Sequence, residues 1–169
     1  MPANIEIKAR VSDFEKLKQA ASRLSEIPCQ MIHQEDTFFN CAQGRIKLRQ
    51  LSPVRGQLIY YRREDILGPK HSEYQIFESD NPGELKAILA QVLGVRGVVT
   101  KNRHLFKVGQ TRIHLDEVEG LGSFMELEVV LRPGQTEAEG QMIAEGLMLE
   151  LGIEPVDLID SAYMDLIET

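Results

Sequence analysis

The chain has 169 residues, of which 43% are hydrophobic and 27% are charged, and its formal net charge is −7. This composition is typical of one globular domain, predicted here to cover residues 1–169, and the negative charge argues against a nucleic-acid partner, whose binding surface would be broadly basic. No apolar run approaches the roughly 20 residues of a membrane helix, and no signal peptide is apparent, so we expect a cytoplasmic protein with no membrane partner.

Alternation of apolar and polar residues predicts about eight strands, and apolar residues at helical spacing predict three or four amphipathic helices. In chain order these are a strand at 4–11, a helix at 12–26, strands at 30–40, 44–51, 57–64 and 72–79, a helix at 81–94, strands at 97–108, 110–118 and 123–131, and helices at 136–151 and 156–167. Nearly all the strands follow one another as hairpins. The sequence therefore predicts an α+β fold dominated by antiparallel sheet.

Two of the helices begin at recognisable N-terminal caps. Asn81 precedes Pro82, and proline is favoured at the first position of a helix. Thr136 and Glu139 have the spacing of a capping box, in which each residue bonds the backbone of the other. These caps predict where two of the helices that cover the sheet begin.

Six of the strand segments carry charged residues two positions apart, with mostly apolar residues between them. The charged positions are Glu6 and Lys8; Lys47 and Arg49; Arg63; Lys101 and Arg103; Arg112, His114 and Asp116; and Glu126 and Glu128. Because successive side chains of a strand point to opposite faces, each segment has one apolar and one charged face. For any single strand, contact with solvent is enough to explain the charged face. Solvent contact does not explain why three strands carry pairs of cations while others carry carboxylates.

The charged face is either open to solvent or enclosed, because the helices must cover the apolar face. Eight antiparallel strands are enough to close into a small barrel that holds one ligand. Enclosing charges of one sign costs many kcal/mol, whereas mixed charges around a ligand and a metal offset that cost. We therefore expect an eight-stranded antiparallel β-barrel, or tunnel, with a charged interior, and an open charged sheet is the alternative.

For three further residues, the alternation along the strands predicts whether the side chain points into the barrel or out of it. His114 is in phase with Arg112 and Asp116, so it is either a tunnel-facing hydrogen-bond donor or proton carrier, or a residue without a role. Tyr61 is in phase with Arg63 and has a structural role or packs beside a base. Arg62 should face outward if Arg63 faces inward.

A series of short motifs runs in order over essentially the whole chain. The motifs are Asn4-Ile-Glu6-Ile-Lys8, Lys47-Leu-Arg49, Tyr61-Arg-Arg63, Lys101-Asn-Arg103, Leu115-Asp116, Gly120-Leu-Gly122-Ser-Phe124-Met-Glu126-Leu-Glu128 and Ser161-Ala-Tyr163-Met-Asp-Leu166. Their order and spacing resemble the CYTH superfamily of triphosphate tunnel enzymes. The stretch from Val108 to Glu126 is most similar to its class IV adenylyl cyclase-like branch.

The resemblance implies a tunnel whose basic side chains bind a triphosphate and whose carboxylates hold Mg²⁺ or Mn²⁺. Carried over by position, the metal ligands are Glu6, Asp116, Glu126 and Glu128, and the triphosphate-binding residues are Lys8, Lys47, Arg49, Arg63, Lys101, Arg103 and Arg112. Asp116 joins the metal ligands or orients a metal-bound water, and Lys8 and Asp116 are the catalytic candidates. These residue types suit that chemistry, because hard dications prefer carboxylate oxygens and Lys and Arg bind phosphate oxygens.

The opening motif departs from the family at one position. The family has Glu-x-Glu-x-Lys, and this chain has Asn4 where the first Glu belongs. The metal site therefore has one carboxylate fewer than in the family, so the number of bound metals or the activity can differ from the family's.

Three functions follow from the resemblance. A class IV adenylyl cyclase converts ATP to cyclic AMP and pyrophosphate, whereas a triphosphatase hydrolyses inorganic or organic triphosphates such as thiamine triphosphate. A non-catalytic nucleotide or polyphosphate binder is the third, motivated by Asn4. The predicted partner is thus a nucleoside, organic or inorganic triphosphate, and homodimerisation is left open.

Overall fold

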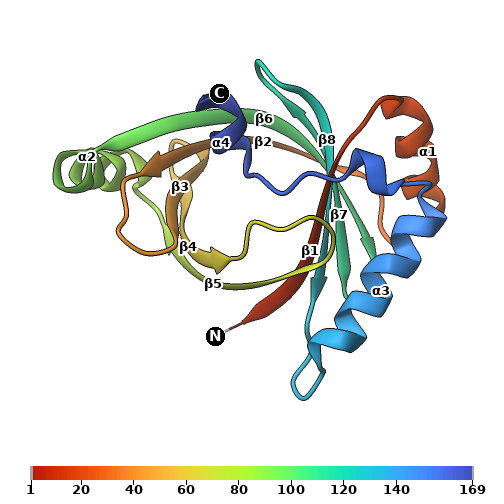
Figure 1. Ribbon diagram of the computed structural model, residues 1–169. Coiled ribbons are helices and arrows are strands. Elements are labelled where there is room, and N and C mark those ends of the chain that lie inside the picture. Colours follow the sequence, from red (N-terminus) through yellow and green to blue (C-terminus); the bar gives the residue numbers. More distant parts are fainter. Residues whose placement is uncertain (1, 169) are drawn as a thin grey trace.

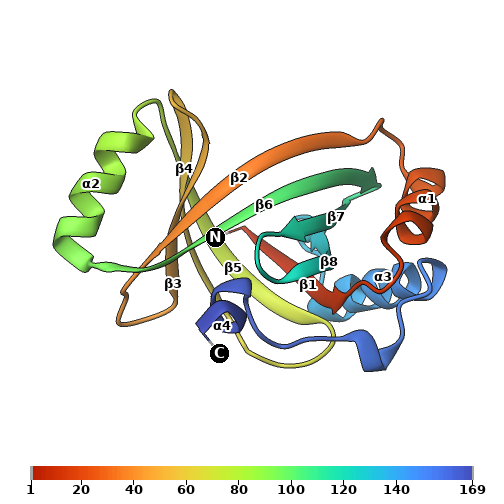
Figure 2. The same cartoon turned by 90° about the horizontal axis from the view of Figure 1, so that it is seen from above.

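The computed structural model describes residues 2–168. Within this range, eight strands form a closed barrel in the order β1-β5-β4-β3-β2-β6-β7-β8, with β8 returning to β1 (Figures 1 and 2). The strands are β1 (Ala3–Arg10), β2 (Gln30–Phe39), β3 (Arg45–Ser52), β4 (Arg55–Arg63), β5 (Lys70–Ser79), β6 (Val95–Val108), β7 (Thr111–Val118) and β8 (Gly122–Val130). All neighbouring pairs are antiparallel, which confirms the predicted eight-stranded barrel.

The first strand closes the barrel. β1 pairs with β8 over residues 4–10 and with β5 over residues 3–6, although both partners lie far along the chain. Short turns join β6 to β7 and β7 to β8, where Gly109 and Gly120 have φ values of +56° and +79°. Only glycine adopts such positive φ values without strain, so these two residues permit the tight hairpins that place β6, β7 and β8 side by side.

Three helices cover the barrel from outside. They are α1 (Phe14–Leu24), α2 (Pro82–Leu93) and α3 (Glu137–Glu150), and α1 and α3 lie on the side opposite to α2 (Figures 1 and 2). The short helix α4 (Tyr163–Glu168) differs, because its first residue, Tyr163, lines the interior of the barrel. Both predicted caps are present: Asn81 accepts a hydrogen bond from the Glu84 backbone N–H at 3.3 Å, and Thr136 and Glu139 form the capping box. Helices of the length and apolarity needed to cross a membrane are absent from residues 2–168.

The main apolar core lies between the barrel wall and the helices α1 and α3. The outward side chains of β1, β7 and β8 supply much of it, among them Ile5, Ile7, Ile113, Leu115 and Leu127. Gly140 sits where α3 approaches the wall most closely, because an added Cβ would lie 2.6 Å from Leu131 and 2.7 Å from Ile5. The apolar face is therefore used for the helices, and the charged face is left for the interior.

The predicted helix at 156–167 is wrong. A 3₁₀ turn, η1 (Pro155–Asp157), is followed by an extended segment, and α4 begins only at Tyr163. The backbone N–H of Ile159 donates to the carbonyl of Lys8 at 3.0 Å, and Leu158 forms an isolated bridge with Ala9. Pairing with β1 thus overrides the helical spacing of the apolar residues.

Candidate functional site

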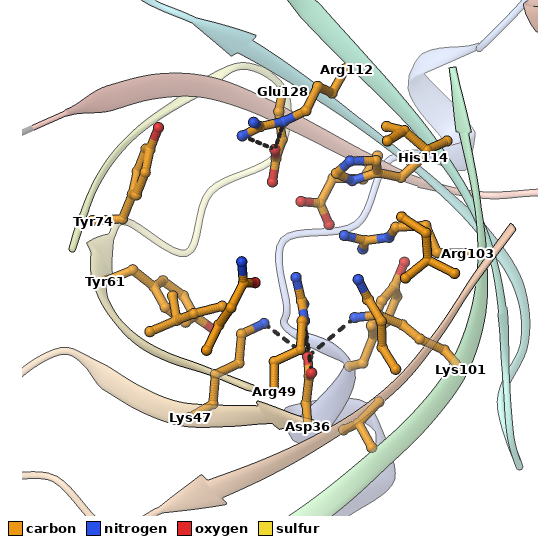
Figure 3. Close-up of a pocket in the computed structure, with 18 of the residues that line it drawn as sticks. Asp36, Lys47, Arg49, Tyr61, Tyr74, Lys101, Arg103, Arg112, His114 and Glu128 are labelled. Carbon is orange, nitrogen blue, oxygen red and sulfur yellow. Dashed lines mark hydrogen bonds and ion pairs between the residues drawn. The ribbon is translucent and has the colours of Figure 1, made fainter. Parts of the chain in front are cut away.

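The barrel encloses a cavity of about 650 Å³ that is lined by the charged faces of its strands (Figure 3). The predicted site residues that line this cavity are Glu6, Lys8, Lys47, Arg49, Arg63, Lys101, Arg103, Arg112, Glu126 and Glu128. Asp116 is buried but does not line the cavity. Arg62 is exposed, in keeping with the alternation along β4.

Asp36 on β2 is surrounded by three of the predicted phosphate-binding residues (Figure 3). Arg49 makes a bidentate contact with it, with both N···O distances at 2.9 Å. The Lys47 and Lys101 ammonium groups lie 3.1 and 3.4 Å from its Oδ2 atom. Burial opposes its ionisation, but the three cations together hold the pKa of Asp36 well below its usual range. Asp36 therefore holds the cations together, and they retain a net positive charge toward the cavity.

Asp116 has a similar relation to Arg103. Both of its oxygens accept hydrogen bonds from Arg103 at 2.8 Å, and its Oδ2 also accepts one from the Tyr163 hydroxyl at 2.8 Å. Burial opposes the charge, yet the Arg103 guanidinium keeps the pKa of Asp116 well below its usual range. With both oxygens occupied, the geometry favours a role in positioning Arg103 over the predicted role as a metal ligand.

Carboxylates gather on the opposite wall, because β8 lies between β1 and β7. Glu128 pairs with Glu6 on one side and with Arg112 on the other, and Glu126 pairs with Lys8 and His114. Burial, followed by repulsion from Glu126 and Glu128, raises the pKa of Glu6 to about 7. Three carboxylates so close together favour a bound cation that relieves their repulsion.

Each of these carboxylates has a cation of the barrel beside it, and the Arg112 guanidinium lies 2.8 Å from Glu128. The Lys8 ammonium lies 3.5 Å from Glu126, and Arg63 lies 3.3 Å from Glu6. Burial lowers the pKa of Lys8, although Glu126 acts in the opposite direction. Lys8 also lies 4.0 Å from the centre of the Tyr163 ring. A lysine with a lowered pKa beside acidic groups is suited to accept or donate a proton during a reaction.

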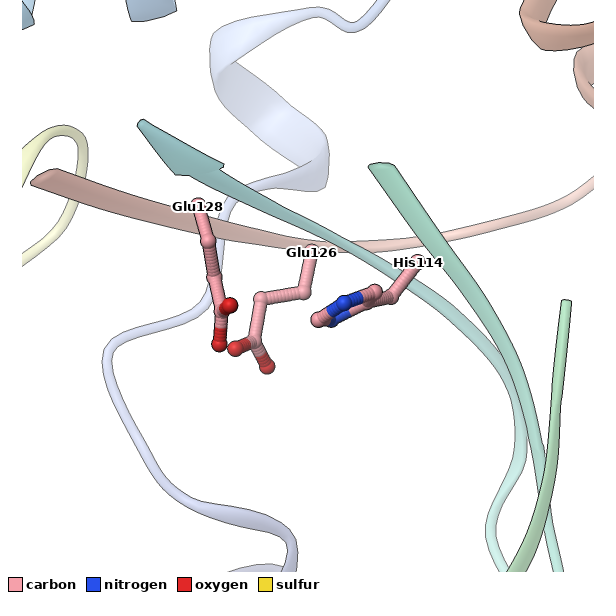
Figure 4. Close-up of side chains that lie close together, drawn as sticks. All are labelled: His114, Glu126 and Glu128. Carbon is pink, nitrogen blue, oxygen red and sulfur yellow. The ribbon is translucent and has the colours of Figure 1, made fainter. Parts of the chain in front are cut away.

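His114, Glu126 and Glu128 form a candidate metal centre (Figure 4). One ligand atom from each residue lies within 4.8 Å of the other two. Burial and the nearby Arg103 lower the pKa of His114 to about 4, so the imidazole is neutral and has a lone pair at neutral pH. Imidazole and carboxylate donors together fit a divalent cation, which supports the predicted use of Glu126 and Glu128.

Three buried residues at the site or beside it lie outside the sequence-based prediction. Asp36 shares one face of β2 with Gln34 and Phe38, but the period of two along this strand does not distinguish it from the adjacent Glu35. Lys70 belongs to a predicted loop, but it is buried at the start of β5, opposite Glu6. It does not line the cavity, and its ammonium donates to the carbonyl of Ile66 at 2.9 Å. Tyr163 belongs to the C-terminal motif, but no pattern in the sequence indicates its bond to Asp116.

Comparison with known proteins agrees with this architecture. The sequence model of the CYTH domain family matches residues 2–163. Adenylate cyclase CyaB of Aeromonas hydrophila is 24% identical over 174 residues, covering 97% of this chain and 88% of that protein. The structure of PH1012 from Pyrococcus horikoshii OT3 has a TM-score of 0.85 and 24% identity, covering 96% of this chain and 98% of that one. HpAC1 from Hippeastrum, which has a dominant triphosphatase activity, has a TM-score of 0.65 and 19% identity, covering 94% and 91%. Because the family match spans nearly the whole chain, this protein belongs to the CYTH domain family.

Proposed function

We propose that the protein is a divalent-metal-dependent enzyme that acts on a triphosphate inside the barrel, converting ATP to cyclic AMP and pyrophosphate. The observation that carries this proposal is the excess of cations in an enclosed cavity that also holds a group of carboxylates. Among the described residues, eight cationic side chains and four carboxylates line the cavity. A polyanion is the ligand that offsets this excess, and a dication suits the group of carboxylates on β1 and β8.

Different side chains of the cavity have different roles. Lys47, Arg49 and Lys101 surround Asp36 and bind phosphate oxygens as a group. Asp116 fixes the orientation of the Arg103 guanidinium, which also binds phosphate oxygens. Positioning and charge stabilisation supply most of the catalysis in phosphoryl transfer, so no side-chain nucleophile is required. Lys8, whose pKa is lowered by burial, accepts the proton of the attacking hydroxyl group when it is in its neutral amine form. A cation held by Glu6, Glu126 and Glu128 would supply Lewis-acid polarisation of the phosphoryl oxygens when bound.

The cavity lining favours an organic triphosphate over a bare inorganic one. Ile32, Leu51, Ile76 and Leu105 line the same cavity as the charged residues. Aliphatic side chains are not needed to bind phosphate, but they suit a base or another organic group. Similarity to CyaB supports cyclisation, and similarity to HpAC1 supports hydrolysis as the second candidate.

Product analysis separates the candidates. The protein is incubated with ATP, thiamine triphosphate or inorganic triphosphate, with Mg²⁺ or Mn²⁺ and with a chelator as the metal-free control. We expect cyclic AMP and pyrophosphate from ATP, only with metal. Release of inorganic phosphate instead identifies a triphosphatase, and tight binding without product identifies a binder.

Triphosphate binding is tested separately with Arg63. Its side chain is 3% exposed, and its Nε and Nη2 atoms have no hydrogen-bond partner among residues 2–168. Such buried donors are costly unless an anion accepts from them. Because charged hydrogen bonds contribute about 1.5–3 kcal/mol, Arg63→Ala should raise the Kd for inorganic triphosphate roughly 10- to 150-fold by calorimetry.

The neighbouring residue provides the matched control. Arg62 has the same charge and lies on the same strand, but it is exposed outside the barrel. Arg62→Ala should leave the Kd unchanged. Equal affinities in the Arg63→Ala variant and the unmodified protein would exclude Arg63 from the triphosphate-binding set.

A further inference from the structure

His114 is a buried side chain whose hydrogen bonding is incomplete. It lies on β7, is 4% exposed and lines the cavity. Its Nδ1 atom has no partner in the part of the chain that the structure describes. A buried imidazole nitrogen normally has a donor, an acceptor or a metal beside it, so this atom points to a missing ligand.

The surroundings of this imidazole are acidic. Glu126 faces His114 directly across the β7–β8 pairing, and Glu128 follows two positions later on the same face of β8. Figure 4 shows the two carboxylates and the imidazole converging on one volume. Ligand atoms of a single dication lie about 2.0–2.6 Å from it, so atoms within 4.8 Å of one another are close enough to share one ion.

Two cations lie beside these carboxylates. Arg112 lies 2.8 Å from Oε2 of Glu128, and Lys8 lies 3.5 Å from Oε2 of Glu126. A dication would therefore share the carboxylates with Arg112 and Lys8, and the imidazole is the donor whose Nδ1 atom has no partner among the described residues.

We propose that His114 is a nitrogen ligand of the metal centre and makes that centre prefer a first-row transition dication over Mg²⁺. This inference rests on the proposed function, because it concerns the same centre. Mg²⁺ prefers oxygen ligands and octahedral geometry, whereas imidazole binds transition metals more readily. Two carboxylates alone would suit either ion, so the imidazole is the group that biases the choice.

The test uses Mn²⁺ as the probe, because its electron spin reports nitrogen directly. Mn²⁺ is titrated into the full chain, and the bound ion is examined by electron spin-echo envelope modulation. We expect nitrogen-14 modulation from the unmodified protein, and its replacement by nitrogen-15 coupling when only the histidines carry that isotope. This measurement needs no variant, so it stands even if a substitution at His114 disturbs folding.

Variants then assign the nitrogen. His114→Gln should remove the modulation and raise the Kd for Mn²⁺ at least 10-fold. A loss of about 10-fold in metal affinity is the smallest effect typical of removing a residue that only hydrogen-bonds to a metal ligand, and removing a ligand itself should cost more. The Kd for Mg²⁺, measured by competition, should rise far less. His104→Gln is the matched control, because His104 is equally buried but contacts Glu117 at 2.9 Å and packs on Phe14, outside the cavity. This control should retain both the modulation and the Mn²⁺ affinity.

The contrary outcomes are distinct. Mn²⁺ bound without nitrogen coupling overturns the role of His114 but leaves the metal centre of the proposed function intact. Absence of Mn²⁺ binding at millimolar concentration overturns both. Modulation that survives His114→Gln, or equal losses of Mn²⁺ and Mg²⁺ affinity in that variant, also contradicts the inference.

Discussion

Replacing Glu126 with glutamine is expected to reduce metal-dependent turnover by about 100-fold or more, since removal of one group that stabilises developing charge costs a factor of this size. Glu126 is the central carboxylate of the site, facing Lys8 across one strand pair and His114 across the other. The substitution keeps the volume of the side chain but removes its charge, so Lys8 loses its partner at 3.5 Å. The measurement is kcat with ATP at saturating Mg²⁺ or Mn²⁺.

A control on the neighbouring strand separates chemistry from folding. Glu117 is an exposed carboxylate of β7 that faces away from the cavity and contacts His104. Glu117→Gln should leave kcat unchanged, and both variants should keep the far-ultraviolet circular dichroism of the unmodified protein. Undiminished turnover in a folded Glu126→Gln protein would remove Glu126 from the metal ligands.

The largest expected loss of stability comes from Asp116→Ala, at about 3–5 kcal/mol in the free energy of unfolding. This substitution leaves the Arg103 guanidinium buried without its carboxylate and deprives the Tyr163 hydroxyl of its acceptor. Breaking a buried pair is costly because the remaining charge is uncompensated, whereas exposed pairs contribute about 0–1 kcal/mol. Urea unfolding monitored by circular dichroism gives the comparison.

Asp65 supplies the exposed counterpart. It accepts hydrogen bonds from Arg45 at 3.1 Å, but its side chain is 54% exposed. Asp65→Ala should therefore change the free energy of unfolding by no more than about 1 kcal/mol. Similar small losses in both variants would show that the Arg103–Asp116 pair is not a buried, mutually dependent contact.

The contribution of the Arg103–Asp116 pair to stability should also be visible in the unmodified protein as a loss of stability at low pH. The folded-state pKa of Asp116 lies below its unfolded value of about 3.9, so its contribution to stability is present above that pH and is lost as the pH falls through the folded pKa. Asp36 behaves likewise, and Glu6, whose pKa is raised, is already protonated there. The free energy of unfolding should fall more steeply below pH 4 in the unmodified protein than in the Asp116→Ala variant.

Local sequence patterns predicted the strands, because their side-chain period of two survives in the barrel wall. The same local rules failed at the C-terminal helix and at Lys70, for a common physical reason. The segment before α4 bonds the backbone of Lys8, and β5 begins early because Lys70 pairs with Glu6 on β1. Both outcomes depend on contacts between distant segments, and such contacts leave no periodic trace in the sequence.

The charged lining was predictable to the extent that each strand had one clearly charged face. β2 did not, because Glu35 and Asp36 are adjacent and alternation alone does not say which one points inward. The structure separates them: Glu35 pairs with Lys86 on α2, and Asp36 lies inside among three cations. The pairing of Asp116 with Arg103 was also hidden, since residues that share a charged face need not share a role.

The closure of the barrel by β1 has a consequence for folding. β1 carries Glu6, but it meets Glu126 and Glu128 only after pairing with β8, near the end of the chain. Closing so long a loop costs entropy, so we expect this pairing to form late. Until then Glu6 lies in water on a separate segment from Glu126 and Glu128. Their repulsion therefore arises mainly in the native state. A bound cation or triphosphate that relieves it should slow unfolding rather than accelerate folding.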